Sequence, residues 1–452
     1  MSSHVFDVIG IGFGPANLAL AVALEESGFS GSIRFLEKRN TFSWQPGMLL
    51  RGSDIQHNPL RDLITPVNPR SAYGFVNYMH GTGRFFEYLN LGAAFPLRRE
   101  FASYVKWVAN QFSHQVAFGT EVTGMKLRTM PDGSEVVVVE CGDGACHLAR
   151  SVVVGPGRSA NVPEIYRPHI GARVFHLVDY LPKIKALPDP AHVIVVGASQ
   201  SAVEIMLDLD ARFPRAEITG LMRSFGYRQK DTSPWTGEVY FPEFTQYYHD
   251  TGWKSRRALS EELRGTNYSS ADADVINQLY LRRYESRLEG ADHHINMVAN
   301  AEANQVEASR DGVRIACTDR HSGAPIQLRA DAVVLATGFL DFGTGGQREL
   351  VHPLLETFCL DYAFHTQHGF EVARDYSLIG EGHPPVYLNG LCESTHGFGD
   401  AGSFSLLSLR ADEICRSLAG RLASSGMEAG ITDNLRLEQS VTSMLSREPL
   451  SA

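Results

Sequence analysis

The sequence has few cysteines, and no two of them form a CxxC pair. Six cysteines are scattered along the 452 residues, without histidines at metal-ligand spacing beside them. A redox-active disulfide needs a close cysteine pair, so that chemistry is excluded, and we expect no metal site. Unpaired cysteines are typical of a reducing cytoplasm. The six are Cys141, Cys146, Cys317, Cys359, Cys392 and Cys415.

The sequence also lacks a targeting segment, a membrane span and an excess of basic residues. The N-terminus MSSHVFDVIGIGFGP has no basic region, and glycines interrupt its apolar run, so we expect no signal peptide. No apolar stretch is long enough to span a bilayer. A net charge of −10 does not indicate a basic surface that could bind the phosphate groups of a nucleic acid. We therefore expect a cytoplasmic protein without membrane or nucleic-acid partners, and the sequence leaves open whether it is a homo-oligomer.

What the sequence has is length and an ordinary globular composition. A chain of 452 residues is long for one hydrophobic core, so two or three domains are expected. Apolar residues make up 43% and charged residues 20% of the chain, which is typical of globular proteins and not of disordered or fibrous ones. Composition therefore indicates a class of protein but no function.

Two segments repeat the order strand, glycine turn, helix. The first has a buried strand at Val5–Ile11, a helix from about Ala16 to Glu26 and a second strand at Ser32–Glu37. The second begins at Ala191, where AHVIVVG predicts a strand, ASQSA a turn and VEIMLDL a helix face. These hydrophobic patterns predict two βαβ-type nucleotide-binding units.

The first turn has glycines at Gly10, Gly12 and Gly14, followed by Pro15. Glycine lets the backbone turn sharply and approach a pyrophosphate, whose charge then lies at the helix N-terminus. Proline is tolerated in the first helical turn because its missing N–H would be unpaired there. Glu37 ends the second strand, where a carboxylate accepts hydrogen bonds from a ribose diol. Together these residues predict a dinucleotide site.

The second turn starts at Gly197 and has Ser199 where the middle glycine of the fingerprint usually stands. One strand later, AEITGLMRS carries Arg223 at the place where an NAD site usually has an acid, with Arg228 and Lys230 close in sequence. A cation there suits the 2′-phosphate of NADP. A solvated surface arginine is the alternative interpretation of Arg223, but the paired sites favour NADPH over NADH.

Further elements are predicted between and after the two units. A β-like segment at Glu135–Cys141 lies between them, and a helical, charged stretch runs from Lys254 to Gly290. Strands return at Gly312–Cys317 and Ala332–Leu335, and a last helix, from about Leu406 to Leu422, precedes a polar, serine-rich tail.

Several separated motifs together resemble the microbial flavin-dependent N-hydroxylating monooxygenases, the ornithine and lysine N-hydroxylases of siderophore and related pathways. The similarity extends from about Asp7 to Leu422. The motifs are GIGFGPANLALA at Gly10, FSWQPGMLL at Phe42, LRDLITPVNPRSAYGFVNYMH at Leu60, REFASYVKWVA at Arg99, GASQSAVE at Gly197, DTSPWTGEVYFPEF at Asp231, TNYS at Thr266, LATGF at Leu335 and THGFGD at Thr395.

The resemblance implies an α/β fold with two Rossmann-like dinucleotide-binding domains, one for FAD and one for NADPH, plus a small helical substrate-binding insertion. It implies an FAD domain at 1–187 and 340–424, an NADPH domain at 188–262 and 298–339, an insertion at 263–297 and a polar tail at 425–452. The activity implied is N-hydroxylation of a small amine by O₂ through a C4a-hydroperoxyflavin, with the chemistry supplied largely by the cofactor.

The resemblance also assigns roles to single residues, and two of them are expected at the catalytic centre, Gln56 near the isoalloxazine and Asn267. Thr337 and Gly338 mark the return of the chain to the FAD domain. For His396 a plain loop-packing role is the alternative. The expected cofactor contacts are Gly10, Gly12, Gly14, Pro15, Glu37, Trp44, Gln56, Gln200, Ser201, Arg223, His396 and Gly397, and the expected substrate contacts are Arg61, Gly237, Asn267 and Ser405.

The departures from the family pattern fall in the substrate pocket. Arg61 stands in P-L-R-D where ornithine hydroxylases have lysine in F-L-K-D, and Gly237 replaces an asparagine. Both family positions bind the α-carboxylate of the substrate. The loop at 398–405 is also changed and one residue longer. An ornithine-like or lysine-like amino acid is therefore the first hypothesis, an acidic amino acid such as aspartate is an alternative, and a diamine or histamine fits less well.

Other function classes fit the sequence less well. Baeyer–Villiger and sulfide-oxidising flavin monooxygenases share the two-nucleotide plan, but they are disfavoured by the motifs at Asp231 and Thr266. A flavin disulfide reductase lacks its cysteine pair here. A non-enzymatic nucleotide-binding module would have little reason to keep two sites.

Overall fold

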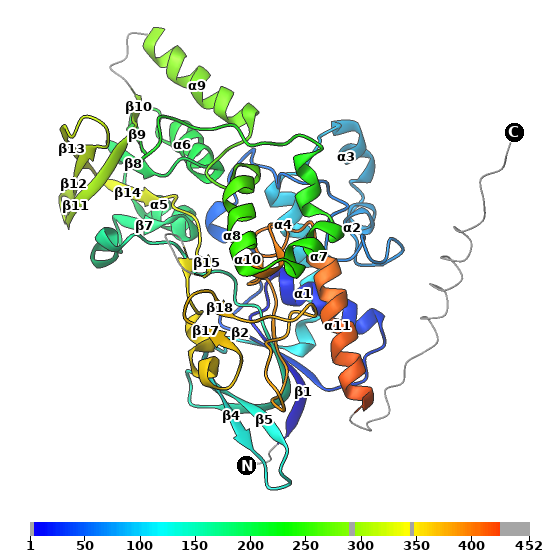
Figure 1. Cartoon of the computed structure of the whole chain (residues 1–452). Helices are drawn as coiled ribbons and strands as arrows, with labels where there is room; N and C mark the ends of the chain where they lie inside the picture. Colours follow the sequence, from blue (N-terminus) through cyan, green and yellow to red (C-terminus); the bar gives the residue numbers. More distant parts are fainter. Residues whose placement is uncertain (1–3, 289–293, 344–347, 425–452) are drawn as a thin grey trace, which may run out of the picture.

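The computed structural model describes residues 4–288, 294–343 and 348–424. The predicted polar tail at 425–452 and the predicted helix end at Gly290 lie outside these residues. Figure 1 shows two α/β bodies, a lower one that contains the N-terminus and an upper one, with short helices between them.

The first sheet contains seven described strands in the order β3-β2-β1-β6-β5-β4, with β19 paired to β6. The strands from β3 to β6 are parallel, whereas β5 pairs antiparallel with both β6 and β4. Val8 and Ile9 of β1 are almost fully buried, as expected for a strand covered on both faces. The strands are β1 (Val5–Ile11), β2 (Ile33–Glu37), β3 (Val116–Phe118), β4 (Val122–Thr129), β5 (Glu135–Cys141), β6 (Cys146–Val154) and β19 (Val386–Leu388).

Helices α1 and α11 pack together beside this sheet, although they are nearly four hundred residues apart in the chain. α1 is buried on almost every side, so its apolar sequence ANLALAVAL has no polar face. The helices of this body are α1 (Pro15–Glu26), α2 (Phe75–Gly81), α3 (Phe85–Leu91), α4 (Arg98–Gln111) and α11 (Leu407–Ser424).

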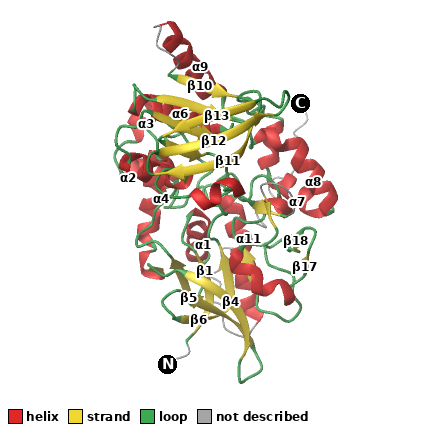
Figure 2. Ribbon diagram, turned by 90° about the vertical axis from the view of Figure 1, so that its left-hand side faces the viewer, coloured by secondary structure: helices red, strands yellow, loops and turns green. Residues whose placement is uncertain are grey.

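The second sheet is wholly parallel in its described part, with the order β10-β9-β8-β14-β7. A three-stranded antiparallel sheet, β11-β12-β13, packs against it, and Figure 2 shows these three strands side by side. The elements are β7 (Val174–His176), α5 (Tyr180–Ala186), β8 (His192–Val196), α6 (Gln200–Arg212), β9 (Glu217–Leu221), α9 (Ala273–Leu288), β10 (Ile295–Val298), β11 (Ala301–Ser309), β12 (Gly312–Asp319), β13 (Pro325–Ala330) and β14 (Ala332–Leu335).

Two strands of the second sheet lie wholly or largely outside the range predicted for the NADPH domain, and those domain boundaries stay a prediction. β7 falls within the range given to the FAD domain, and β10 begins in the range given to the helical insertion and ends at Val298. Each joins the sheet by pairing with a distant strand, Val174 with Val333 and Ile295 with Ile218. Strands of three or four residues carry little periodicity of their own, so long-range pairing decides them.

The predicted helical stretch consists of two helices that pack in different places. α8 (Trp253–Glu262) and the preceding α7 (Pro242–Asp250) contact α10 (Glu393–His396), which follows the first sheet. α9 instead contacts α6 and β10 of the second sheet. The loop between α8 and α9 carries the TNYS motif and therefore lies between the two bodies.

Short elements complete the described fold, and none of its helices is both long and apolar enough to cross a membrane. The short strands are β15 (Asp341–Phe342), β16 (Arg348–Glu349), β17 (Phe364–His365) and β18 (Gly369–Phe370), and the 3-10 helices are Pro46–Met48, Ser113–Gln115, Glu164–His169, Leu177–Asp179, Thr236–Tyr240, Leu263–Thr266 and Pro353–Leu360.

Candidate functional site

The turn between β1 and α1 has the form that a dinucleotide pyrophosphate requires. Gly12 has a φ of 78°, and a Cβ there would lie 2.7 Å from the carbonyl oxygen of Gly155. Gly14 is the N-cap of α1, a Cβ there would meet nothing within 4 Å, and among the described residues no side chain caps the helix. Open space at an uncapped helix N-terminus is where a phosphate binds. Pro15 occupies the first helical turn, as predicted.

Glu37 lies beside this turn at the end of β2. Its Oε2 accepts a hydrogen bond of 2.8 Å from the backbone N–H of Phe13, and its Oε1 accepts one of 2.9 Å from that of Arg39. The backbone N–H of Gly12 donates to the carbonyl of Leu36 at 2.8 Å, which joins the turn to the same strand. The carboxylate is thus held at the glycine turn, where an adenosine ribose would need an acceptor.

An aromatic cluster includes Trp44, which is one of the predicted cofactor contacts. The ring of Trp44 lies 5.3 Å from that of Phe404 and 6.0 Å from that of Phe101. His57 packs against the same two rings, at 5.4 Å from Phe404 and 5.3 Å from Phe101. The two ring nitrogens of His57 are buried and have no hydrogen-bond partner among the described residues.

Burial and, to a smaller extent, the positive charges of Arg61 and Lys230 together lower the pKa of His57 to about 3. The imidazole is therefore neutral at physiological pH. Sequence reasoning missed this residue, because a lone histidine in a loop gives no signal of its burial.

The second glycine turn also requires glycine at its first position. Gly197 has a φ of 143°, and a Cβ there would clash with the carbonyl of Ala336. Ser199 is the N-cap of α6, and no described side chain caps this helix. Gln200 and Ser201 begin the helix, although the sequence predicted them in the turn, and their contact with NADPH stays a prediction. A helix N-terminus is thereby available for a second pyrophosphate.

Arg223 lies two residues after β9, next to this turn. The backbone N–H of Gly197 donates to the carbonyl of Leu221, the last residue of β9, at 3.0 Å. The side chain of Arg223 is exposed, as a residue that receives a nucleotide phosphate must be. Its contact with NADPH stays a prediction.

A series of hydrogen bonds links Gln56 to the second glycine turn. Gln56 donates through Nε2 to the carboxylate of Asp272, and the backbone N–H of Asp272 donates to Oε1 of Gln200 at 2.8 Å. Gln200 donates through Nε2 to Glu204 at 3.0 Å, and Glu204 is bound by both Nη atoms of Arg98, at 2.8 and 2.9 Å. No sequence pattern predicted this connection, because its residues come from four separate segments.

Two of the predicted substrate residues meet directly. Nη1 of Arg61 donates a hydrogen bond of 3.1 Å to Oγ of Ser405, although 344 positions separate them in sequence. Gly237 lies in the 3-10 helix Thr236–Tyr240, and a Cβ there would meet nothing within 4 Å, so the glycine leaves open space. Asn267 is half-buried at the end of the 3-10 helix that precedes the TNYS loop.

The residue after Asn267 belongs to a buried charged cluster that joins the two bodies. Nη1 of Arg158 donates to Tyr268 and to Asp341, each at 3.0 Å, and the hydroxyl of Tyr268 donates to Glu393. Burial raises the pKa of Glu393 to about 8, the charge of Asp341 adds to the rise, and Arg158 opposes it. This cluster fixes the loop that carries Asn267.

His396 and Gly397 lie at the end of α10. The ring of His396 stacks on Tyr376 at 4.0 Å, and its Nδ1 lies 2.9 Å from the hydroxyl of Thr395. Loop packing, the alternative interpretation of His396, therefore describes what its side chain does here, while a cofactor contact stays a prediction. Gly397 has a φ of 93°, which favours glycine.

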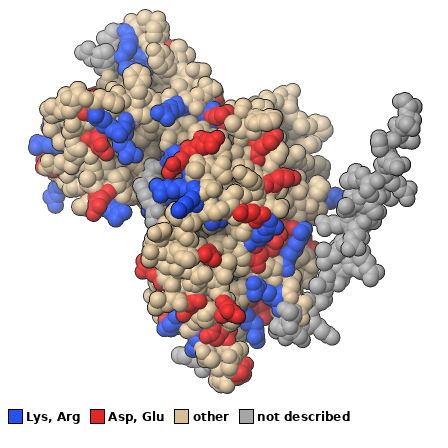
Figure 3. Space-filling model, viewed as in Figure 1, with Lys and Arg blue, Asp and Glu red and all other residues tan. Residues whose placement is uncertain are grey.

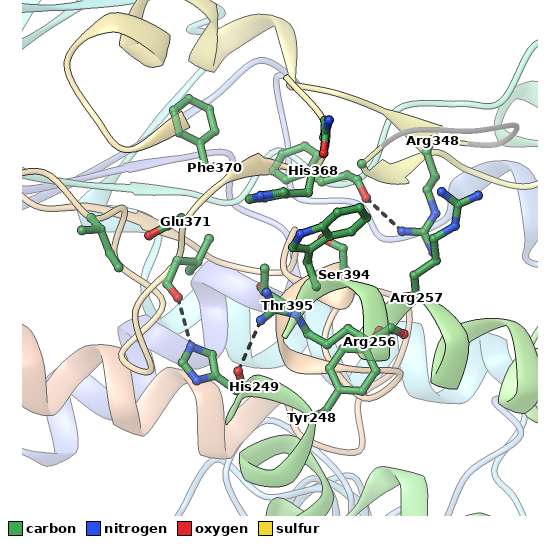
Figure 4. Close-up of a pocket in the computed structure, with 16 residues that line it drawn as sticks. Tyr248, His249, Arg256, Arg257, Arg348, His368, Phe370, Glu371, Ser394 and Thr395 are labelled. Atoms are coloured by element: carbon green, nitrogen blue, oxygen red, sulfur yellow. Dashed lines mark hydrogen bonds between the residues drawn. The ribbon is translucent and has the colours of Figure 1, made fainter. Parts of the chain in front are cut away.

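A separate pocket of about 320 Å³ contains none of the predicted site residues. Figure 4 shows Arg256, Arg257 and Arg348 on one side of it and Glu371 on the other. Elsewhere basic and acidic side chains are interspersed over the face shown in Figure 3. The pocket is lined by Tyr248, His249, Trp253, Arg256, Arg257, Phe342, Gly343, Arg348, Gln367, His368, Phe370, Glu371, Val372, Ile379, Ser394 and Thr395.

Comparison with known proteins gives a consistent result along most of the chain. The family described as L-lysine 6-monooxygenase/L-ornithine 5-monooxygenase matches residues 4–341. The L-ornithine N(5)-monooxygenase of Burkholderia cepacia is 36% identical over 432 residues, which cover 92% of this chain and 95% of that protein.

Two solved structures are similar in fold and in sequence. The reduced ornithine hydroxylase of Pseudomonas aeruginosa superposes with a TM-score of 0.84 at 32% identity and covers 93% of this chain and 100% of its own. The ornithine N-hydroxylase of Kutzneria sp. 744, described with reduced FAD, NADP⁺ and L-ornithine, has a TM-score of 0.84 at 31% identity and covers 92% of this chain and 100% of its own.

Proposed function

The chain belongs to the family of L-lysine 6-monooxygenases and L-ornithine 5-monooxygenases, and from this premise we propose that it N-hydroxylates a primary amine of a small, carboxylate-bearing amino acid. It is an NADPH-dependent flavin monooxygenase with FAD as its flavin. We propose the turn at Gly10–Pro15 with Glu37 as the FAD site. The turn at Gly197 with Gln200, Ser201 and Arg223 is the proposed NADPH site. FAD, when bound, would supply the oxygen chemistry.

The observation that carries the substrate proposal is the meeting of Arg61 and Ser405. A guanidinium presents a planar fork that binds a carboxylate through two parallel hydrogen bonds. Only one Nη of Arg61 is used by Ser405, and no carboxylate lies within 4 Å of the guanidinium among the described residues. A substrate carboxylate would complete this arrangement, because a partly buried cation without a counter-charge is costly.

The surroundings of His57 also favour the reactive form of an amine. The amine must lose its proton before its lone pair can attack an electrophilic oxygen. Burial and the positive charges of Arg61 and Lys230 hold His57 neutral, and the same effects lower the pKa of any amine placed beside it. A free alkyl amine in bulk solvent would be protonated. The surroundings of His57 therefore help to activate the amine by favouring its neutral form.

An acidic amino acid such as aspartate is the second candidate, and two observations favour it. Two cations, Arg61 and Lys230, act on His57, and a substrate with two carboxylates could pair with both. The open space at Gly237 removes a side chain that ornithine-binding relatives are expected to use. Both candidates carry a carboxylate, and a diamine or histamine does not.

The proposal is tested by measuring NADPH oxidation and hydroxylamine product with ornithine, lysine, aspartate, putrescine and histamine. We expect purified protein to bind FAD and to form hydroxylamine from one of the three amino acids. Product from ketones or sulfides alone would instead indicate a Baeyer–Villiger or sulfide-oxidising enzyme. A folded protein that neither carries nor responds to FAD would overturn the proposal.

A further inference from the structure

We propose that Asp272 is a positioning residue that fixes the amide orientation of Gln56 and connects it to Gln200 at the start of α6. Asp272 immediately precedes α9, while Gln56 lies in a loop of the first body. This inference rests on the proposed function, in which Gln56 faces the flavin and Gln200 the NADPH. The inference assigns to Asp272 a role in setting the midpoint potential of the bound flavin.

The orientation of Gln200 follows from the groups on its two sides. A carboxylate only accepts hydrogen bonds and a backbone N–H only donates them. The NH₂ group of Gln200 must therefore face Glu204, at 3.0 Å, and its carbonyl must face the N–H of Asp272, at 2.8 Å. The backbone N–H of Gln200 is also bound, to the carbonyl of Ser270 at 3.0 Å. Gln200 therefore cannot flip without losing both contacts.

Glu204 is in turn held from the first body. Arg98 binds both of its carboxylate oxygens, and the two side chains are 9% and 5% exposed. Nη1 of Arg98 also donates to the carbonyl of Met48 at 3.0 Å. Bidentate arginine–carboxylate pairs are rigid as well as strong. Glu204 is therefore held in one orientation.

The orientation of Gln56 follows from the carboxylate of Asp272. Because that carboxylate only accepts, Gln56 must turn its NH₂ group toward it. The backbone of Gln56 has a φ of 60°, which is uncommon outside glycine, and its N–H donates to Oδ1 of Asp54 at 3.0 Å. Both ends of the residue are thus held, and Oε1 of Gln56 accepts no hydrogen bond among the described residues.

The free carbonyl oxygen has a chemical consequence at a flavin. An amide oxygen accepts hydrogen bonds, and reduced flavin carries a proton on N5 that oxidised flavin lacks. A Gln56 that presents Oε1 therefore stabilises reduced flavin over oxidised flavin, whereas a flipped Gln56 that presents NH₂ does the reverse. Asp272 selects the first orientation. Asparagine at this position would both donate and accept, so it would permit either orientation.

The test measures the midpoint potential of bound FAD in Asp272→Asn, without any amine present. We expect a potential more negative by about 30 mV, which corresponds to a tenfold weaker preference for reduced flavin. The Kd of NADP⁺ should stay within twofold, because the link to Gln200 uses the backbone N–H of residue 272. Asp274→Asn is the matched control, since Asp274 is exposed, makes no described hydrogen bond, and acts on Asp54 through its charge as Asp272 does.

Asp272→Glu provides the rescue, because it keeps an acceptor-only group at the same place. Its potential should stay closer to that of the parent than to that of Asp272→Asn. Equal shifts in Asp272→Asn and Asp274→Asn, no shift in Asp272→Asn, or a glutamate variant that shifts as far as asparagine would each overturn the proposal. If the parent binds FAD but hydroxylates no amine, the proposed function fails and the potentials still decide the role of Asp272.

Discussion

Arg61, which follows the first glycine-turn unit in the chain, donates a hydrogen bond of 3.1 Å to Ser405 near the C-terminal helix. The contact joins two of the four positions predicted to bind substrate. We expect Arg61→Ala to raise the KM of the true substrate at least about tenfold, which is roughly 1.4 kcal/mol. Steady-state kinetics should show little change in the KM of NADPH, because the hydrogen bond described for Arg61 goes to Ser405 and not to the second glycine turn.

Arg70→Ala is the control for this variant, since Arg70 is an exposed arginine of the same segment and its loss should leave KM unchanged. An unchanged substrate KM in Arg61→Ala would show that Arg61 does not bind a carboxylate. A parent enzyme that prefers putrescine or histamine over every amino acid would show the same.

Arg223 is expected to distinguish NADPH from NADH. The parent should use NADPH better than NADH, and Arg223→Ala should narrow the difference, because a charge-assisted contact to the 2′-phosphate contributes about 1.5–3 kcal/mol. The ratio of kcat/KM for the two nucleotides measures this. Arg314→Ala removes an exposed arginine from β12 and should leave the ratio unaltered. Equal use of both nucleotides by the parent would refute the role of Arg223.

Removing one partner of the buried pair of Arg98 and Glu204 is expected to lower the stability of the fold strongly. Arg98→Met leaves the carboxylate of Glu204 buried without its cation, which typically costs about 3–5 kcal/mol. Urea unfolding measures the difference. The neighbouring Arg99 is exposed, so Arg99→Met should change stability by less than about 0.5 kcal/mol. The double variant Arg98→Met with Glu204→Leu should recover much of the loss, because no unpaired charge is left.

Glu393 is expected to make stability depend on pH. Burial raises its pKa to about 8 in the folded chain from an ordinary value of 4.5, so folding binds a proton and stability falls as pH rises from about 4.5 to about 8. Glu393→Gln is uncharged throughout. Its stability relative to the parent should therefore rise by at least about 1.4 kcal/mol, the worth of one pKa unit, between roughly pH 6 and pH 9.

Thermal or urea unfolding at several pH values gives this difference. Glu381→Gln changes an exposed glutamate, and its stability should change with pH as that of the parent does. Parallel curves for Glu393→Gln as well would contradict the raised pKa of Glu393.

The elements that form the nucleotide-binding units were predictable from sequence. β1, β5 and β14 have the predicted bounds, because each is a largely buried run of mostly apolar residues. The α/β fold class and the family resemblance are confirmed. The motifs of the nucleotide-binding units are local, because the glycines and the helix that follows them lie in one short segment. The sequence pattern alone was therefore sufficient to predict these units.

What could not be predicted depends on contacts between distant segments. Arg98 and Glu204 are 106 positions apart, and neither residue differs in pattern from a surface charge. His57 and Asp272 likewise stand in ordinary loop sequence. The short strand β7 exists because β14 pairs with it. Such residues are placed by tertiary packing, which overrides local propensity.

The chain leaves the first body and returns to it at one place. Asn161 donates through its backbone to the carbonyl of Gly338 at 3.0 Å and through its side chain to that of Thr337 at 2.9 Å, and Ala160 pairs with Phe339. The outgoing and returning strands therefore lie in contact, which makes the segment between them a module inserted into a host. Its excision would leave two ends close enough to be joined by a short turn, but it would also remove α7 and α8 and so uncover α10 of the host.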